Sequence, residues 1–400
     1  MSDLPARFLA SLGPSEALGL AVSGGGDSIA MLHLAVACGL RPAIVTVNHG
    51  LRAEAAAEAE QVGVVASALG LSHTTLLWQG WDHSGNLQDE ARKARRRLIA
   101  AWAVQNNIAT VALGHTQNDI AETLVMRLQR GAGVDGLAAM AAHWPEGGIL
   151  WQRPLLGFTR SELRQWLQAQ GKTWVEDPSN DNPRFDRVRA RKAMAVLQPL
   201  GVTPARLAQV AAHLAEARTA LDALADDWAV QTLREDCGTV TIAPALWSAP
   251  AETQRRVLQR VLLWIAPAEY APRGSQLGQL LARLSCGQAA TLAGVRFLQG
   301  RGGLRALREA KAAAPRCAAD QIWDGRWQVV GDVPDGAELG PLDAAGLAQC
   351  PDWRSTGLPR AALLASPAVW LGERLVAAPL AGFETASIRA LPLHPLLRAN

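Results

Sequence analysis

The chain has 400 residues, of which 49% are hydrophobic and 19% charged, so we expect two or three domains with substantial cores. Its five cysteines form no CxxC pair, which argues against a disulfide scaffold and a zinc or iron–sulfur site and favours a cytoplasmic location. The first residues lack the features of a signal peptide, and no apolar stretch reaches the length of a membrane span. The formal net charge of +3 neither indicates nor excludes a nucleic-acid partner.

Strand-like and helix-like segments alternate through the first half of the chain. Short apolar runs predict five strands, at 17–23, 42–50, 72–78, 108–115 and 148–156. Amphipathic segments with capping residues or terminal glycines predict the intervening helices, at 28–39, 53–70, 86–107, 118–133 and 159–171. The alternation predicts an α/β fold with a doubly wound, mainly parallel five-stranded sheet. Ligands of such folds bind at the carboxyl ends of the strands, near the topological switch point.

The pattern changes after about residue 200. Thr203 and Pro204 begin a long amphipathic helix, which predicts a helical linker at 203–235. The remaining segments predict a helix at 274–284, a hairpin at 289–309, a linker at 309–320 and a strand-like run at 326–331. We therefore expect an α/β domain over 1–200, a helical and α+β domain over 201–312, and a small, β-rich C-terminal domain over 313–400.

The stretch SGGGDS (23–28) joins the first predicted strand to the first predicted helix. Consecutive glycines let the backbone approach a ligand closely, and the amides at a helix start bind phosphate. No lysine follows the glycines, so the Walker A pattern does not fit, and GxGxxG is absent here. Asp27 would repel a phosphate unless a cation lay between them, so it predicts a bridging Mg²⁺. A plain turn with Asp27 at the helix N-terminus is the alternative.

A strand followed by SGGxDS and a helix resembles the PP-loop ATP pyrophosphatases, which split ATP at its α-phosphate and adenylate a substrate oxygen. Further segments are similar to the tRNA(Ile)-lysidine synthetases: VNHGLR (47–52), NLQDEARKARRRLI (86–99), GHTQNDIAET (114–123), RPLL (153–156) and WVEDPSNDNPRFDRVRAR (174–191). The resemblance is dense over 17–200 and looser over 291–309, and it implies a catalytic domain followed by a tRNA-binding domain. It also implies ATP and Mg²⁺, and ligation of L-lysine to C2 of the wobble cytidine of tRNA(Ile) with a CAU anticodon.

The resemblance and the motifs together name four groups of site residues. The catalytic group is Asp27, His115, Asp119 and Glu122, with Asp119 and Glu122 on one face of a predicted helix. ATP is expected on Ser23, Gly24, Gly25, Gly26, Asp27, Ser28, Val47 and Asn48, with Asp27 as the metal ligand. Lysine is expected on Asp119, Glu122, Glu176 and Asp177. The tRNA is expected on Arg92, Arg95, Arg96, Arg187, Arg189 and Arg191, although basic runs are also typical of solvated helix faces.

The chain departs from the family pattern at several positions. Relatives commonly carry two adjacent aspartates and a glutamine where this chain has Asn118, Asp119 and Ile120, so Asp119 is the expected carboxylate. Many relatives have histidine where this chain has Asn48, and asparagine is usual where this chain has Val188. The alternatives are a tRNA thiolase, for which the expected cysteines are absent, and a non-catalytic tRNA-binding protein, which only Asn118 favours. A homodimer is left open, and no membrane partner is expected.

Overall fold

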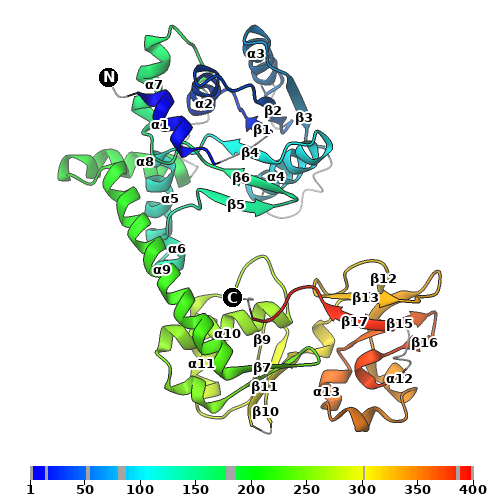
Figure 1. The fold of residues 1–400 in the computed structure, drawn as a ribbon. Coiled ribbons are helices and arrows are strands. Elements are labelled where there is room, and N and C mark those ends of the chain that lie inside the picture. The colour runs from blue at the N-terminus through cyan, green and yellow to red at the C-terminus, as the bar shows by residue number, and fades with distance from the viewer. Residues whose placement is uncertain are drawn as a thin grey trace. The chain divides into compact units, whose positions relative to one another are not determined.

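The computed structural model describes residues 3–13, 17–50, 55–79, 87–176, 186–300, 302–383 and 388–397. The chain forms two compact units, residues 1–218 and 219–400 (Figure 1). The boundary lies within the long helix α9 (Pro204–Thr232), which the capping signal at Thr203 and Pro204 predicted. The division into three domains, at residues 200 and 312, stays a prediction.

The first unit alternates strands and helices as its sequence predicted. Its strands are β1 (Leu18–Ala21), β2 (Ala43–Asn48), β3 (His73–Leu77), β4 (Thr110–Leu113), β5 (His143–Glu146) and β6 (Ile149–Gln152). Its helices before α9 are α1 (Leu4–Ser11), α2 (Gly26–Ala37), α3 (Ala55–Ala68), α4 (Leu87–Gln105), α5 (Gln117–Gln129), α6 (Val134–Leu137), α7 (Arg160–Ala169) and α8 (Asp186–Leu197).

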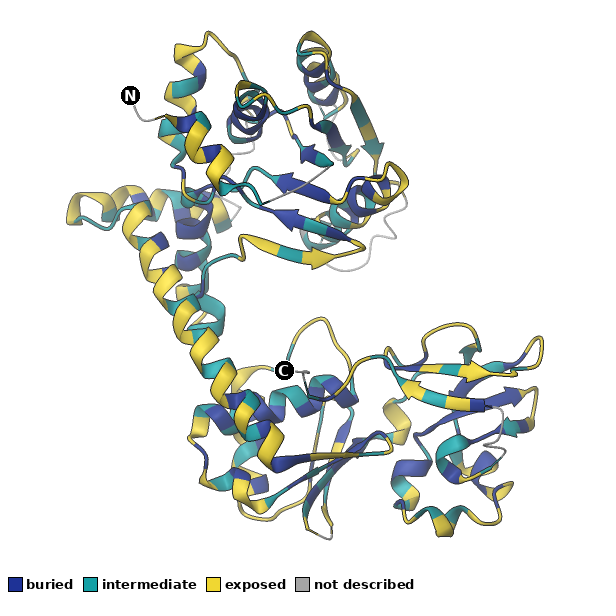
Figure 2. Ribbon diagram, viewed as in Figure 1, coloured by how far each residue is buried: buried dark blue, intermediate teal, exposed yellow. Residues whose placement is uncertain are grey.

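The strands form one sheet in the order β3-β2-β1-β4-β6-β5. The five predicted strands are confirmed, and their pairs are all parallel. The sequence analysis missed β5, which pairs antiparallel with β6 at the edge of the sheet. Its sequence, HWPE, contains a proline and is mostly exposed (Figure 2), so it lacks the apolar run of a buried strand.

Successive residues of the central strands face opposite sides of the sheet, and each side has its own core. Leu20, Ile44 and Ala112 pack with α1, α2, α3 and α7 on one face. Val45 and Val111 pack with Ile99, Trp102 and Trp151 under α4 on the other. Helices on both faces confirm the predicted doubly wound α/β arrangement. A smaller core joins α5 to the start of α9 through Ile120, Leu124, Ala208 and Ala211.

The described residues of the second unit form three sheets. A five-stranded sheet in the order β7-β8-β11-β10-β9 packs against α10 (Ala251–Ile265) and α11 (Gly274–Ser285). The strands are β7 (Leu233–Asp236), β8 (Thr239–Ile242), β9 (Ala290–Leu292), β10 (Val295–Gly300) and β11 (Gly303–Arg308). The predicted hairpin is confirmed: β10 and β11 are antiparallel, and Gly300 pairs with Gly303.

The rest of the second unit is rich in β-structure, as predicted. It contains β12 (Cys317–Ala318), β13 (Trp327–Gly331), β14 (Glu338–Pro341), β15 (Pro367–Leu371), β16 (Arg374–Ala377) and β17 (Ile388–Pro392), with the short helices α12 (Asp343–Ala348) and α13 (Arg360–Leu363). The predicted linker at 309–320 contains β12. A 2.7 Å ion pair joins Arg308, the last residue of β11, to Asp324, which follows this segment.

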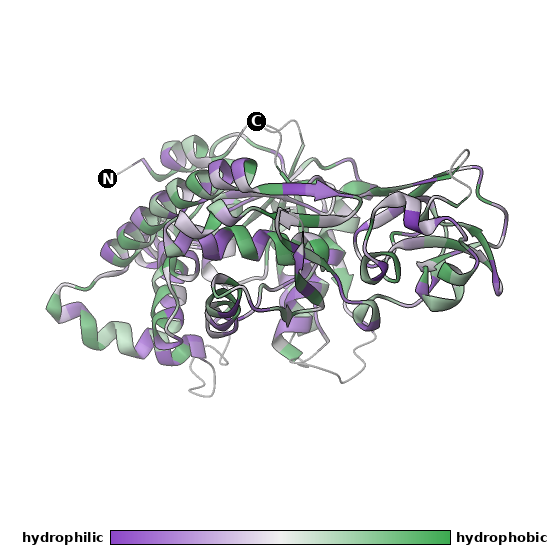
Figure 3. Ribbon diagram, turned by 90° about the horizontal axis from the view of Figure 1, so that it is seen from below, coloured by the Kyte–Doolittle hydropathy of each residue, from purple (hydrophilic) through white to green (hydrophobic). Residues whose placement is uncertain are grey.

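Hydrophilic and hydrophobic residues alternate along the helices (Figure 3), as expected when one face packs on a core and the other faces water. No helix in the described part of the chain is both long and apolar enough to cross a membrane.

Candidate active site

The glycine loop lies at the topological switch point of the sheet. Strand β1 has β2 on one side and β4 on the other, so the chain leaves β1 and β4 in neighbouring positions at the same edge. The loop 22–25 follows β1, and residues 114–116 follow β4. The sheet therefore brings the two segments that the sequence singled out to the edge where such folds bind ligands.

The loop is closed by its own hydroxyl groups. The Ser28 hydroxyl donates to the carbonyl of Gly25 at 2.9 Å and accepts from the backbone N–H of Ser23 at 3.2 Å. Gly24 has φ +89°, a conformation that glycine adopts without strain. Helix α2 begins at Gly26 and points its first amides at the loop. Amides at a helix start favour an anion, so phosphate binding at Ser23 to Ser28 stays a prediction that this geometry suits.

A second segment closes the other side of the loop. Val175 donates its backbone N–H to the carbonyl of Gly24 at 3.1 Å. Trp174 lies against Gly26, where an added Cβ would come within 3.2 Å of the indole ring. Glu176 pairs with Arg164 at 3.4 Å on an exposed surface. Its described contacts therefore lie beside the glycine loop, whereas Asp177, its predicted companion, lies outside the described residues.

Asp119 performs two tasks at the start of α5. Its Oδ2 accepts hydrogen bonds from the backbone N–H and the hydroxyl of Thr116, each at 2.8 Å, and so caps the helix. Its Oδ1 lies 3.6 Å from Nη2 of Arg160. Asp119 therefore has a structural role as a helix cap, and its catalytic role stays a prediction.

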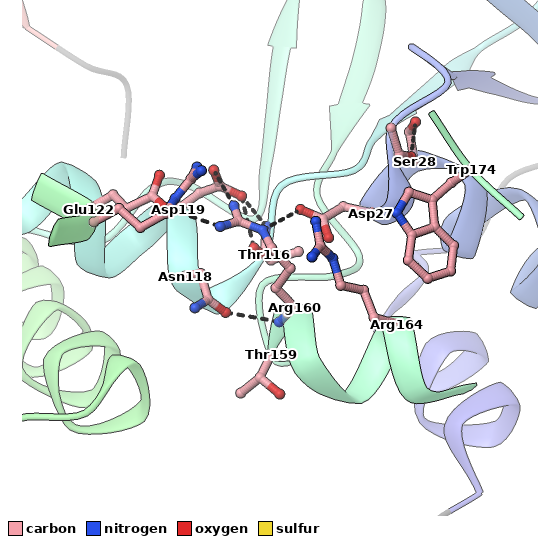
Figure 4. A network of polar contacts seen from close by, with 12 residues as sticks. Asp27, Ser28, Thr116, Asn118, Asp119, Glu122, Thr159, Arg160, Arg164 and Trp174 are labelled. Carbon is pink, nitrogen blue, oxygen red and sulfur yellow. Dashed lines mark hydrogen bonds and ion pairs between the residues drawn. The ribbon is translucent and has the colours of Figure 1, made fainter. Parts of the chain in front are cut away.

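Arg160 connects the three predicted carboxylates (Figure 4). Its Nε lies 3.0 Å from Oδ2 of Asp27, and its Nη1 lies 3.1 Å from Oε1 of Glu122. Arg191, on α8, reaches the same Glu122 oxygen at 3.1 Å. The side chains of Asp119 and Glu122 are only 10% and 4% exposed, so these contacts are shielded from water.

The environment shifts the pKa values of these groups in different directions. Burial raises the pKa of Asp27, and the nearby charge of Arg160 only partly opposes it. Burial also acts to raise the pKa of Asp119, but the Thr116 hydrogen bond and the Arg160 charge outweigh it, so the pKa falls below its usual value. Burial would lower the pKa of Arg160, yet its carboxylate neighbours raise it, so the guanidinium stays charged.

His115 follows β4 and is a neutral imidazole. Burial lowers its pKa to about 3, with help from the charges of Arg153, Arg187 and Arg95, while Asp119 acts in the opposite direction. Its Nδ1 accepts a hydrogen bond from Nε of Arg153 at 3.2 Å, so the proton of the neutral ring belongs on Nε2. His115 can therefore donate a hydrogen bond from Nε2, but it is too weak a base to accept a proton at neutral pH.

We expect the His115 ring to stay neutral from pH 9 down to about pH 4, because burial opposes its charged form. The unfolded chain protonates this ring near pH 6.5, so its contribution to stability is lost as the pH falls from 6.5 toward 3. Nitrogen-15 spectra of the imidazole, assigned with His115→Asn, measure the titration directly. A midpoint near 6.5 for His115 would contradict the structure.

The positions that depart from the family pattern have local structural roles. Oδ1 of Asn118 accepts the backbone N–H of Arg160 at 2.8 Å and so fixes the start of α7. Val188 is buried in α8, where an apolar side chain fits. The carbonyl of Asn48 accepts from Trp78 at 2.9 Å within the β2–β3 ladder, so Val47 is the better candidate for a main-chain contact with adenine.

The predicted tRNA-binding arginines fall into two sets. Arg92 and Arg187 are exposed, and Arg95 is partly exposed beside them. The others have acidic partners: Arg96 pairs with Glu146, Arg189 with Asp186, and Arg191 with Glu122. Burial lowers the pKa of Arg95, and the nearby positive charges of Arg187 and Arg92 add to this shift. Three positive charges therefore lie close together, as expected where a polyanion binds.

Sequence analysis missed two arginines that belong to the site. Arg160 stands in the segment TRSE, in which Thr159 and Glu162 form the capping box of α7. Arg153 stands in RPLL, and its guanidinium lies 3.9 Å from the ring centre of Trp144 while bonding His115. The quoted RPLL motif was a usable signal for Arg153, whereas the place of Arg160 depends on how α7 packs.

Comparisons with known proteins agree with this geometry. A family model described as a PP-loop domain matches residues 5–197. The tRNA(Ile)-lysidine synthase of Ruegeria pomeroyi is 48% identical over 389 residues, which cover 96% of this chain and 92% of the relative. The tRNA(Ile)-lysidine synthase of Novosphingobium aromaticivorans is 40% identical over 309 residues, covering 74% of this chain and 91% of the relative. The chain therefore belongs to the tRNA(Ile)-lysidine synthase family.

Proposed function

We propose that the protein ligates L-lysine to C2 of the wobble cytidine of tRNA(Ile) with a CAU anticodon, in two steps that release pyrophosphate and AMP. In the first step the cytidine C2 oxygen attacks the α-phosphate of ATP, and pyrophosphate leaves. In the second step the ε-amine of lysine attacks C2, and AMP leaves with that oxygen. The observation that carries the proposal is the glycine loop lying beside Asp27, Asp119 and Glu122 at one sheet edge.

The residues present fit a Mg²⁺ ion that accompanies the nucleotide. Oδ1 of Asp27 is buried and has no hydrogen-bond partner among the described residues, so a carboxylate oxygen next to the phosphate loop is available as a ligand. Mg²⁺ is commonly held by one or two carboxylates together with substrate phosphates. Such an ion would neutralise charge that develops on the phosphates.

The protein's own groups then have separable tasks. The glycine loop and the first amides of α2 hold the ATP phosphates, and main-chain groups near Val47 hold adenine. Asp119 and Glu122 orient the ammonium group of lysine, and a carboxylate of this cluster accepts its proton before attack. Nε2–H of His115 is a hydrogen-bond donor next to this cluster. We expect the enzyme in the cytoplasm, where its tRNA substrate is used.

A tRNA thiolase is the alternative within the superfamily. Such chemistry needs a cysteine or an iron–sulfur cluster near the activated base, and Cys38 is the only cysteine of residues 1–218. It follows the last residue of α2, about 18 Å along the helix from the glycine loop, and its Sγ donates to the carbonyl of Pro5. The position of Cys38 therefore favours lysine over sulfur as the second reactant.

One assay tests the proposal. The purified protein is incubated with labelled lysine, ATP, Mg²⁺ and an isoleucine tRNA transcript with a CAU anticodon, beside a transcript with a GAU anticodon as a control. We expect label in the CAU transcript only, with one AMP formed per lysine. Absence of lysine incorporation, together with sulfur transfer from a persulfide donor, would establish the thiolase instead.

Replacement of Arg187 by glutamine should weaken tRNA binding, because Arg187 is exposed near Arg95 and has like charges around it. We expect the KM for tRNA to rise several-fold and the slope of log K against log salt to fall by about one. The KM for ATP should be unchanged. Arg191→Gln is the contrast: since Arg191 pairs with Glu122, we expect it to act mainly on the KM for lysine. If both variants raised the KM for ATP equally, Arg187 would belong to the nucleotide site.

A further inference from the structure

A single guanidinium lies among all three carboxylates of the proposed active site. Arg160 contacts Oδ2 of Asp27 at 3.0 Å and Oε1 of Glu122 at 3.1 Å, and lies 3.6 Å from Oδ1 of Asp119. The remaining oxygens of the first two, Oδ1 of Asp27 and Oε2 of Glu122, are buried and accept no hydrogen bond from any described group. The Glu122 side chain is only 4% exposed, so its open acceptor is shielded from bulk water.

The composition of this cluster is that of a divalent-cation site, but its geometry is not. Three carboxylates are ligands that Mg²⁺ and Mn²⁺ prefer. Within the described residues, however, no three acidic, histidine or cysteine side chains are arranged so that they could hold a metal ion. The reason is visible in Figure 4, where Asp27, Asp119 and Glu122 lie around Arg160 instead of around a common open point.

The position of Arg160 is set by the backbone. Arg160 is the first residue of α7, and its N–H is held by Oδ1 of Asn118 at 2.8 Å. Thr159 and Glu162 form a capping box around the same turn, with the Thr159 N–H 2.9 Å from Oε2 of Glu162. The guanidinium therefore starts from a fixed point, and its place among the carboxylates does not depend on a mobile loop.

We propose that Arg160 is a positioning residue that occupies the centre of the carboxylate cluster, so that the enzyme binds a divalent cation only together with a nucleotide. Without a nucleotide, its positive charge opposes the binding of a divalent metal ion at Asp119 and Glu122. With ATP bound, phosphate oxygens supply the ligands that complete a site on Oδ1 of Asp27. The inference rests on the proposed function, because it assumes that the glycine loop holds ATP.

The test is Mn²⁺ binding to the full chain without nucleotide, measured by electron paramagnetic resonance of the free ion. Arg160→Gln should bind Mn²⁺ at least about tenfold more tightly than the wild type does. The variant removes one of the two cations, Arg160 and Arg191, that contact the cluster. Arg160→Lys should show a smaller gain, since an ammonium keeps the positive charge but lacks the planar fork of N–H donors of the guanidinium. Arg7→Gln is the matched control. Arg7 lies on α1 and pairs with Glu162 of α7, outside the carboxylate cluster, so this variant should leave the Mn²⁺ affinity unchanged.

A double variant identifies where the ion binds. Adding Glu122→Gln to Arg160→Gln should abolish the gain, because Glu122 supplies one of the freed carboxylates. The inference is overturned if Arg160→Gln folds and shows no gain, or if the gain survives Glu122→Gln. If Arg160→Gln does not fold, a gain in Arg160→Lys supports the inference and its absence overturns it. The Mn²⁺ assay contains no lysine or tRNA, so its result is independent of the ligation assay. If the Mn²⁺ affinity rises as expected but the wild type ligates no lysine, only the proposed function is refuted.

Discussion

Replacement of Asp27 by asparagine is expected to lower the rate of AMP and pyrophosphate release by about 10²–10³-fold while leaving tRNA affinity within about twofold. Asp27 lies in the first turn of α2 next to the phosphate loop, and its Oδ1 is the buried carboxylate oxygen that we assign to the metal. An amide oxygen is a weaker ligand for Mg²⁺ and carries no charge. Its loss should therefore affect the nucleotide step and spare the tRNA contacts.

Two measurements separate this role from a purely structural one. Pyrophosphate release reports the first chemical step, and filter binding of labelled tRNA reports the fold of the tRNA site. Asp3→Asn is the matched control, because Asp3 caps α1 by accepting the backbone N–H of Ala6 at 3.2 Å and makes no described hydrogen bond to the loop. If Asp27→Asn lost tRNA binding, AMP formation and thermal stability together, Asp27 would be a structural residue of the helix N-terminus.

Replacement of Glu122 by glutamine is expected to block the second step instead. Glu122 is buried and receives both Arg160 and Arg191 on one oxygen, so glutamine would leave these cations undercompensated and remove the charge offered to lysine. We expect the KM for lysine to rise about a hundredfold, as for the loss of a charged hydrogen bond in a buried site. Pyrophosphate release without lysine should continue, because the glycine loop is not in contact with Glu122 in any described interaction.

The design of this experiment depends on separating the two half-reactions. Adenylated tRNA is trapped by omitting lysine and is then mixed with lysine and enzyme in a single turnover. Glu60→Gln, at an exposed position of α3, controls for the loss of one negative charge. A variant that is slow in the first half-reaction but normal in the second would place Glu122 with the nucleotide and not with the amino acid.

Asp27→Asn is expected to impair the first chemical step and Glu122→Gln the second, although both residues belong to one cluster. Among the described contacts, Asp27 and Glu122 are linked only through Arg160, which contacts both. Because residues in one network are not additive, the double variant should lose less than the product of the single effects. The Arg160 variants then report whether this coupling is transmitted by the guanidinium.

Much of the fold of the first unit could be predicted from the local pattern of apolar and polar residues. Short apolar runs separated by amphipathic stretches predicted five parallel strands, and the structure confirms each of them. The loop SGGGDS could be recognised because its chemistry is local: glycines, hydroxyls and a helix start stand within six consecutive residues. Strand β5 could not be recognised, because an edge strand with one neighbour needs no apolar alternation.

Some of the site residues could be grouped from their spacing along the chain, and others only from the order of the strands in the sheet. Asp119 and Glu122 share a helix face by simple periodicity, so their proximity was predictable from spacing alone. Their meeting with Asp27, some 92 positions earlier by residue number, needed the order of the strands, because β1 and β4 are neighbours only in the folded sheet. The resemblance to a family supplied the identity of the second reactant, which no spacing indicates.

By itself, the sequence determined a doubly wound α/β unit with a phosphate loop after its first strand and carboxylates after its fourth. Only the tertiary structure decided that Arg160 stands among these carboxylates and that Arg191 pairs with Glu122. The physical reason is that hydrogen bonding and hydrophobic periodicity are local along the chain, whereas a counter-ion for a buried carboxylate can come from any element packed against it. Arg160 comes 38 residues after Glu122, and α7 brings it there.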